Sequence, residues 1–254
     1  MKVRRQIERE FGVPIAGEIL PPEQWTKTAL KDIPEGPLNW QELFGRQAPM
    51  ILDLGCGNGR FLIGSAVWRP SHDHLGIDIL PLVIRYATRR GNQRGLTNLR
   101  FAVADAKEFL RSQVAPGSVE EIHCYHPQPY FGPDQLSRRL ITPLFLALLH
   151  RSLARGGSLF VQTDNPGYWK YMKEVIPVFF EFQERPGTWP DAPKGRTRRE
   201  IIALRRGLAV FRGTGIARPL LSPEEALRLA EVLPPPTFSA DRRLRELDEM
   251  EWKE

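Results

Sequence analysis

Cysteine is scarce in this sequence, and long apolar runs are absent from it. The 254 residues include two cysteines, Cys56 and Cys124, which are too few for a disulfide framework or a cysteine-based metal site. The most apolar stretch, 140–149, is much shorter than a membrane span and contains Pro143. The first six residues include no apolar segment of the signal-peptide kind. These absences predict a protein of the reducing cytoplasm that holds no metal and does not enter a membrane.

Positive charge, by contrast, is in excess and is unevenly distributed. The sequence has 36 lysines and arginines against 30 aspartates and glutamates, a formal net charge of +6. The segment 194–218 has one acid, Glu200, and eight cations, so it accounts for the whole excess: Lys194, Arg196, Arg198, Arg199, Arg205, Arg206, Arg212 and Arg218. A charged run is most often a solvated face, but this one coincides with a strand hairpin predicted at 200–204 and 208–211. We therefore expect it to contact a nucleic-acid backbone.

Three glycines directly follow the pattern of a buried strand in the stretch 50–61, Met-Ile-Leu-Asp-Leu-Gly-Cys-Gly-Asn-Gly-Arg-Phe. Gly55, Gly57 and Gly59 would let the backbone approach a ligand where a Cβ atom would clash. Their G-x-G-x-G spacing differs from the G-x-G-x-x-G of dinucleotide-binding folds. Asp53 falls at the carboxyl end of the strand, where open α/β sheets bind ligands. For the glycines alone, a tight structural turn is the simpler alternative.

Two further predicted strands also end on acids. The strand 74–78 ends on Asp78, which can reach both hydroxyls of a ribose in a βαβ unit. The strand 99–103 leads into Asp105 and Ala106. Three acids at three successive strand ends, after one glycine turn, resemble the class I S-adenosylmethionine (SAM) methyltransferases. This resemblance implies SAM as cofactor and an α/β, Rossmann-like fold with a mostly parallel, seven-stranded sheet and helices on both faces.

The order of the expected elements agrees with that fold. Between 50 and 164, strands and helices alternate, which is typical of a parallel sheet covered on both faces. Further helices are expected at 81–91, 134–154 and about 222–232, and further strands at 119–125 and 158–163. The chain therefore divides into an N-terminal arm with little regular structure (1–49), a methyltransferase domain (50–218) and a C-terminal helical extension or tail (219–254).

Motifs spread over Pro21 to Arg212 narrow the resemblance. They are Leu43-Phe-Gly45, Asp53-Leu-Gly-Cys-Gly-Asn-Gly59, Gly76-Ile-Asp78, Asp105-Ala106, Pro127-Gln-Pro129 with Arg138-Arg139, Thr163-Asp164 with Tyr168 and Met172, and Thr197-Arg-Arg-Glu200 with Gly207. Together they resemble the tRNA (guanine-N7-)-methyltransferases, which methylate a guanine in the tRNA variable loop. The Thr-x-x-Glu and Thr-Asp elements are far more specific than the glycine turn, because most SAM-binding folds lack them.

The resemblance assigns roles to residues of this sequence. It implies that SAM is bound by the glycine turn and the strand ends: Asp53, Gly55, Gly57, Gly59, Asp78, Asp105 and Ala106. It implies that Asp164, Thr197 and Glu200 bind the substrate guanosine. Arg138 and Arg139, with the cations of 194–218, would hold tRNA phosphates. A monomer or a homodimer is expected, with no obligate protein partner.

The sequence departs from the family in the loop after the fourth strand. The usual Pro-Asp-Pro-Trp reads Pro-Gln-Pro-Tyr here, so the catalytic aspartate position holds Gln128 and the tryptophan position holds Tyr130. Gly132 stands where a lysine is usual, and Arg199 stands where an aromatic is usual within Thr-x-x-Glu. An amide oxygen accepts a weaker hydrogen bond than a carboxylate does. Two alternatives therefore stay open: a SAM-dependent methyltransferase for another substrate, and a non-catalytic paralogue that binds RNA or SAM.

Overall fold

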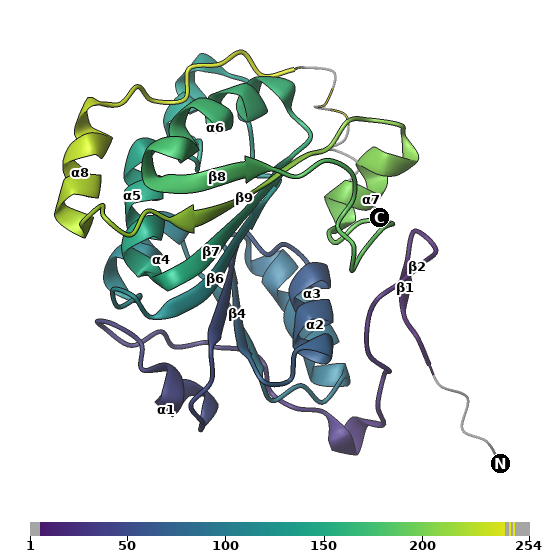
Figure 1. Ribbon diagram of the computed structural model, residues 1–254. Helices are drawn as coiled ribbons and strands as arrows, with labels where there is room; N and C mark the ends of the chain where they lie inside the picture. The colour runs from purple at the N-terminus through teal and green to yellow at the C-terminus, as the bar shows by residue number, and fades with distance from the viewer. Residues whose placement is uncertain (1–5, 242–243, 245, 247–254) are drawn as a thin grey trace.

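A seven-stranded sheet forms the centre of the computed structural model, which describes residues 6–241, 244 and 246 (Figure 1). Its strand order is β5-β4-β3-β6-β7-β9-β8. The bounds are β3 Met50–Leu54, β4 Asp73–Asp78, β5 Leu99–Val103, β6 Val119–Tyr125, β7 Leu153–Thr163, β8 Phe180–Glu184 and β9 Phe211–Ala217. The pairs from β5 to β7 are parallel, and β9 runs antiparallel to both β7 and β8. The predicted mostly parallel, Rossmann-like sheet is confirmed.

Helices cover both faces of the sheet, because the central strands are apolar on both sides. Every residue of β3 is buried. Ile51 packs with α2 (Arg60–Trp68) and α3 (Pro81–Gln93) on one face. Leu52 and Leu54 pack on the other face with the three helices α4 (Ala106–Ser112), α5 (Pro143–Ser152) and α6 (Pro166–Phe179). Figure 1 shows the two layers on opposite sides of the strands.

The prediction of one long helix at 134–154 is wrong. A 3₁₀ helix occupies Pro133–Arg138, and α5 begins only at Pro143. The Thr142 side chain caps α5 by accepting a hydrogen bond from the Phe145 amide at 3.2 Å, and proline is favoured at a first helical position. At its other end α5 passes directly into β7, which is five residues longer than the predicted strand at 158–163.

The prediction of a strand hairpin at 200–204 and 208–211 is also wrong. Residues Arg198–Arg205 form the helix α7, which Thr197 caps by accepting from the Glu200 amide at 3.1 Å. The following strand, β9, begins at Phe211. The helix predicted at about 222–232 is confirmed as α8 (Pro223–Val232), with a capping box between Ser222 and Glu225.

The described part of the N-terminal arm has little regular structure, as expected. It contains the two-residue strands β1 (Arg9–Glu10) and β2 (Val13–Pro14), a 3₁₀ turn at Pro22–Gln24 and the helix α1 (Trp40–Phe44). Among the described residues, no helix is long and apolar enough to cross a membrane. Most of the end of the predicted C-terminal tail, residues 242–243, 245 and 247–254, lies outside the described residues.

Candidate active site

The predicted cofactor residues meet at the carboxyl edge of β3, β4 and β5. The amides of Gly55 and Cys56 both donate to the carbonyl of Ile77 at 2.9 Å, which places the glycine turn on the end of β4. The amide of Ala104 donates to the carbonyl of Asp78 at 3.1 Å, which joins the end of β5 to the same edge. The first three acids are therefore brought together as the parallel register requires.

Asp78 is tied to the glycine turn. Its carboxylate accepts from the Gly57 amide and from the Leu80 amide, each at 3.0 Å. Burial raises the pKa of Asp78 although these backbone hydrogen bonds oppose the shift. The carboxylate is thus held in place at the mouth of the turn, with lone pairs left on both oxygens for hydroxyl donors of a ligand.

Asp53 is buried and incompletely paired. Asp53 is only 2% exposed, and its Oδ1 has no hydrogen-bond partner among the described residues. Burial, followed by the nearby Asp78, raises the pKa of Asp53 to about 8. A buried polar atom without a partner is costly, and it marks a position where a ligand donor would be stabilising.

The glycine turn has the shape that a cofactor needs. Gly55 and Gly57 have φ of 81° and 53°, and a Cβ atom added to either would meet nothing within 4 Å. A side chain there would fill the open space beside the acids and would adopt a strained backbone. Gly59 has a different role, since a Cβ atom would lie 2.7 Å from the Phe101 ring. It allows the turn to pack against β5.

Asp105 closes this edge at the start of α4. Its carboxylate caps the helix by accepting from the Glu108 amide at 3.0 Å, while the residue itself is exposed. Ala106 is the first residue of α4 and is half-buried. Together with the unpaired Asp53 oxygen and the open glycine turn, this donor set fits SAM: carboxylates for its hydroxyl and ammonium groups, and bare backbone for close approach.

The predicted guanosine residues gather farther along the same edge, where the end of β7 lies beside α7. Asp164 follows β7 and accepts from Arg199 Nε at 2.6 Å. Burial alone would raise the pKa of Asp164, but His126 and the Arg199 guanidinium together hold that pKa well below its usual range. The carboxylate is therefore ionised, and the unusual Arg199 of the Thr-x-x-Glu motif is its internal counter-ion.

Glu200 is fully engaged within the protein. It is 0% exposed, accepts from Arg212 Nε at 3.0 Å and also accepts from the Arg196 amide at 2.7 Å. Thr197 contributes its hydroxyl to the cap of α7. The structure thus places Thr197 and Glu200 at the start of the same helix that delivers Arg199 to Asp164, with a structural role that the sequence motif alone did not indicate.

His126 is a residue of this site that sequence reasoning missed. Trp189 Nε1 donates to Gln162 Oε1 at 2.6 Å, which fixes the direction of the Gln162 amide. The Gln162 NH₂ then donates to His126 Nε2 at 2.7 Å, so the network assigns the imidazole proton to Nδ1. That Nδ1 lies 3.6 Å from Asp164 Oδ1, too far for a hydrogen bond. The only sequence signal is its position directly before Pro127.

The two neighbouring arginines differ sharply. Arg138 is exposed, with its guanidinium 5.7 Å from the centre of the Tyr130 ring. Arg139 is only 1% exposed, and it donates to backbone carbonyls of residues 129, 130, 236 and 238 at 2.6 to 2.9 Å. The prediction that Arg139 holds a phosphate is therefore wrong, because its guanidinium is enclosed and makes four hydrogen bonds to backbone carbonyls. Gln128 lies exposed in the loop between β6 and these arginines.

The cationic segment is also less open than expected. Arg199 and Arg212 are buried in ion pairs with Asp164 and Glu200. Arg196 pairs with Asp191 at 2.6 Å. The cations of this segment that remain exposed are Lys194, Arg205, Arg206 and Arg218. Half of the predicted basic patch thus stabilises the fold instead of facing solvent.

The N-terminal arm supplies a second feature without a sequence signal. Glu10 of β1 is 5% exposed and accepts from Asn58 of the glycine turn at 2.8 Å. It also accepts from Arg90 at 3.3 Å and from Arg198 of α7 at 3.1 Å. One carboxylate thus joins the cofactor turn, α3 and the helix of the predicted substrate residues. The sequence distance of 188 residues between Glu10 and Arg198 explains why no local pattern indicated it.

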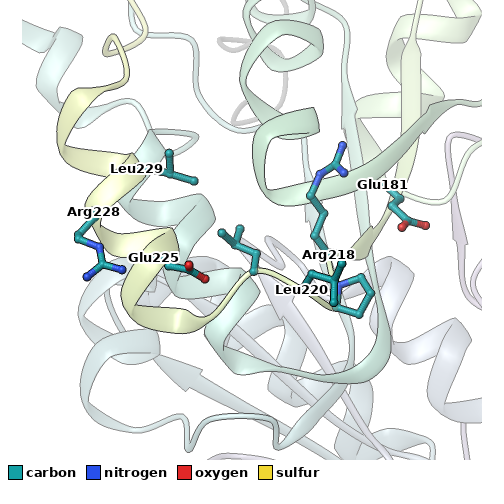
Figure 2. A pocket seen from close by; sticks show the side chains of 8 residues that line it. Glu181, Arg218, Leu220, Glu225, Arg228 and Leu229 are labelled. Carbon is teal, nitrogen blue, oxygen red and sulfur yellow. The ribbon is translucent and has the colours of Figure 1, made fainter.

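A cavity of the described part of the chain lies elsewhere. It measures about 550 Å³ and is lined by residues around α8 and the end of β9, including Glu181, Arg218, Leu220 and Arg228 (Figure 2). Because β9 runs antiparallel to β7, Arg218 lies at the opposite edge of the sheet from Asp164. This cavity is separate from the acids and the glycine turn.

Fold and site together define a class I SAM-dependent methyltransferase. Solved structures show the same fold. The 16S rRNA methyltransferase KamB aligns with a TM-score of 0.51 at 16% identity, over 73% of this chain and all of that one. A 16S rRNA (adenine(1408)-N(1))-methyltransferase from Catenulisporales acidiphilia, crystallised with SAM, aligns with a TM-score of 0.50 at 15% identity, over 71% and 91%.

Sequence relatives identify the family within this class. The family model described as "Putative methyltransferase" matches residues 47–212. A tRNA (guanine-N(7)-)-methyltransferase of Halorhodospira halophila is 34% identical over 69% of this chain and 78% of its own length. That of Alkalilimnicola ehrlichii is 32% identical over 82% and 88%. The chain belongs to the tRNA (guanine-N7-)-methyltransferase family, as the sequence motifs indicated.

Proposed function

We propose that this protein transfers the methyl group of SAM to N7 of a guanine in the variable loop of tRNA. The observation that carries the proposal is the position of Asp164. It lies at the same sheet edge as Asp53, separated from β3 by a single strand, β6. The loop that follows β6 carries Gln128. A guanine bound at Asp164 would therefore adjoin both the cofactor residues and the loop in which the family has its catalytic acid.

Methyl transfer to guanine N7 requires little acid–base catalysis from the protein. Guanine N7 has a free lone pair, so no general base must first remove a proton. When SAM is bound, its sulfonium supplies an activated methyl group, and the positive charge passes to the purine during transfer. This chain's residues must then align N7 with the methyl group and stabilise the cationic purine. The ionised carboxylate of Asp164 supplies acceptor oxygens in a water-poor position, while Arg199 balances its charge.

Carboxylates also suit the edge of guanine that carries N1–H and N2–H₂. We propose Asp164 as the acceptor for these donors, since Arg212 and the Arg196 amide already occupy Glu200. Glu200 and Thr197 then act by fixing the start of α7. Gln128 offers one neutral acceptor oxygen, so it would support the cationic purine more weakly than an aspartate would.

The polyanionic substrate would lie along the exposed cations near the site. Arg138 flanks the Gln128 loop, and Arg205 and Arg206 end α7. We further propose that the protein acts in the cytoplasm as a monomer or homodimer. Its two cysteines are free and buried, which suits a reducing compartment.

Methyl transfer from labelled SAM to bulk tRNA lacking this modification tests the proposal. We expect the label in 7-methylguanosine, identified by mass after digestion of the tRNA to nucleosides. Label in another nucleoside would show that the altered loop has changed the target. SAM binding without transfer to any nucleoside would favour the non-catalytic alternative, which the loss of the loop aspartate at Gln128 keeps open.

A further inference from the structure

The segment after α8 packs against the candidate active site. It lies beyond residue 212, where the match to the family model ends. Tyr171 of α6 donates its hydroxyl hydrogen to the Pro234 carbonyl at 3.0 Å. The Phe238 ring then stacks on Tyr168 with ring centres 4.6 Å apart. Figure 1 shows this segment, in yellow, passing from α8 over α6.

Arg139 joins this segment to the loop that carries Gln128. Its Nε donates to the Pro129 carbonyl at 2.6 Å, and its Nη2 donates to the Tyr130 carbonyl at 2.9 Å. Its Nη1 donates to the carbonyls of Pro236 and Phe238 at 2.7 and 2.9 Å. The guanidinium also lies 3.7 Å from the centre of the Phe238 ring. One buried cation thus holds two chain segments that are about 100 residues apart.

The loop has a backbone that needs such support. His126 and Tyr130 both have positive φ, 50° and 43°, which is uncommon for residues with a side chain. Strained positions of this kind persist only where the surroundings fix them. The Tyr130 carbonyl and that of the preceding Pro129 are the two loop groups that Arg139 holds.

The same C-terminal segment also reaches the other side of the site. The Leu244 carbonyl accepts from Arg199 Nη2 at 3.4 Å, and the Leu244 side chain packs with Ile202 of α7. Arg199 is the residue that pairs with Asp164. The C-terminal region therefore contacts the support of the Gln128 loop through residues 236 and 238, and the support of Asp164 through Leu244.

We propose that Arg139 is a positioning residue for methyl transfer, and that the segment 234–238 completes the active site through it. Arg139 acts through the backbone of the Gln128 loop and contacts no substrate itself. This inference rests on the proposed function for its catalytic readout. Its structural half, the fixing of the loop by Arg139 and Phe238, stands independently of which nucleoside is methylated.

The test compares Arg139→Lys with Arg151→Lys in the full-length protein. Arg151 is a matched control, because it also donates to backbone carbonyls, those of residues 110, 111 and 114, at the end of α5 away from the site. A lysine cannot supply the fork of donors that four carbonyls require. Phe238→Leu is a second variant, which keeps the apolar contact and loses the stacking.

Hydrogen exchange of the amides of Gln128, Tyr130, Phe131 and Gly132 gives the direct readout. We expect both Arg139→Lys and Phe238→Leu to exchange faster at these amides, and Arg151→Lys to exchange there like the wild type. We expect kcat to fall by about 10- to 100-fold in Arg139→Lys, since small misplacements carry penalties of that size. SAM affinity should stay within about twofold of the wild type, because the Gly55–Gly59 turn is untouched.

Unchanged loop exchange and unchanged kcat in folded Arg139→Lys and Phe238→Leu proteins would overturn the inference. Equal losses in Arg139→Lys and Arg151→Lys would overturn it too, because they would reveal only a general loss of stability. If the wild type forms no 7-methylguanosine, the proposed function fails, while the exchange data still decide whether Arg139 fixes the loop. If Arg139→Lys does not fold, Phe238→Leu alone decides.

Discussion

The raised pKa of Asp53 predicts that SAM binding depends on pH below neutrality. In the protein without SAM, Asp53 has a pKa of about 8 because it is buried and lies near Asp78. An acid with a raised pKa holds its proton in the folded protein, so at pH 7 most Asp53 carboxyls are neutral. To accept a hydrogen bond from the SAM ammonium as a carboxylate, Asp53 must first lose that proton. Binding should therefore weaken as pH falls.

The magnitude follows from the distance between the pH and this pKa. Ionising Asp53 costs about 1.4 kcal/mol at pH 7 and about 2.7 kcal/mol at pH 6. The SAM dissociation constant should therefore rise about tenfold from pH 7 to pH 6, with close to one proton released on binding. The sign is opposite for folding without SAM: the folded protein keeps a proton that the unfolded chain has lost, so Asp53 contributes less to the free energy of unfolding as pH rises from 3.8 to about 8.

Isothermal titration calorimetry from pH 5.5 to 7, in buffers of different ionisation enthalpy, measures both the affinity and the proton release. Asp53→Asn should bind SAM more weakly at pH 7 but with no dependence on pH. Asp105→Asn, which changes an exposed acid of the same edge, should keep the slope of the wild type. A flat affinity profile for the wild-type protein would refute the reasoning, since Asp53 would then be ionised already or not involved in binding.

Three further outcomes are expected. Gln128→Asp should raise kcat about tenfold, because an ionised acceptor stabilises a cationic purine more than an amide does; single-turnover methylation that is slower or unchanged would contradict this. Arg205→Gln and Arg206→Gln should each reduce the slope of log tRNA affinity against log salt by about 1, and an unaltered slope in filter binding would remove this surface from the tRNA contact. Glu10→Gln should lower the free energy of unfolding by about 3 kcal/mol, because several buried cations lose their shared carboxylate. Glu8→Gln, which changes a partly exposed carboxylate, should lower it by about 1 kcal/mol. Equal losses in denaturant titrations would argue against a special role of Glu10.

The sheet could be predicted from the sequence because its strands carry strong local signals. The strand predicted at 119–125 has those bounds in β6, Asp78 ends β4, and Asp53 is the second-last residue of β3. Short apolar runs that each end on a glycine or an acid and alternate with helices are typical of a parallel sheet, so few other sheet topologies fit this sequence. The position of the cofactor residues follows from the same register.

The predictions failed where capping overrode the apolar pattern. Ile201 and Ile202 look like part of a strand, since β-branched residues favour strands, but the Thr197 cap and the buried face of α7 select a helix. A leucine stripe suggested one long helix through 134–154. Thr142 and Pro143 instead start a new helix there, which is the usual place of proline.

The roles of the charged side chains could not be read from the sequence, because burial and pairing arise from distant segments. Arg139 looks like Arg138 in the sequence, yet Arg139 is enclosed by the C-terminal segment and Arg138 is exposed. Arg199 and Arg212 look like part of a basic surface, and both are internal counter-ions. The clustered positive charge of 194–218 predicted a polyanionic partner, but it could not say which cations remain free to meet one.

The most direct test of the central claim removes the proposed nucleophilic atom from the substrate. Two transcripts of the same tRNA would be compared, one with guanine and one with 7-deazaguanine, in which a carbon replaces N7 while the N1–H and N2–H₂ donors remain. We predict methyl transfer from labelled SAM to the guanine transcript and none to the 7-deazaguanine transcript, with similar binding of both. Equal methylation of the two transcripts would contradict transfer to guanine N7.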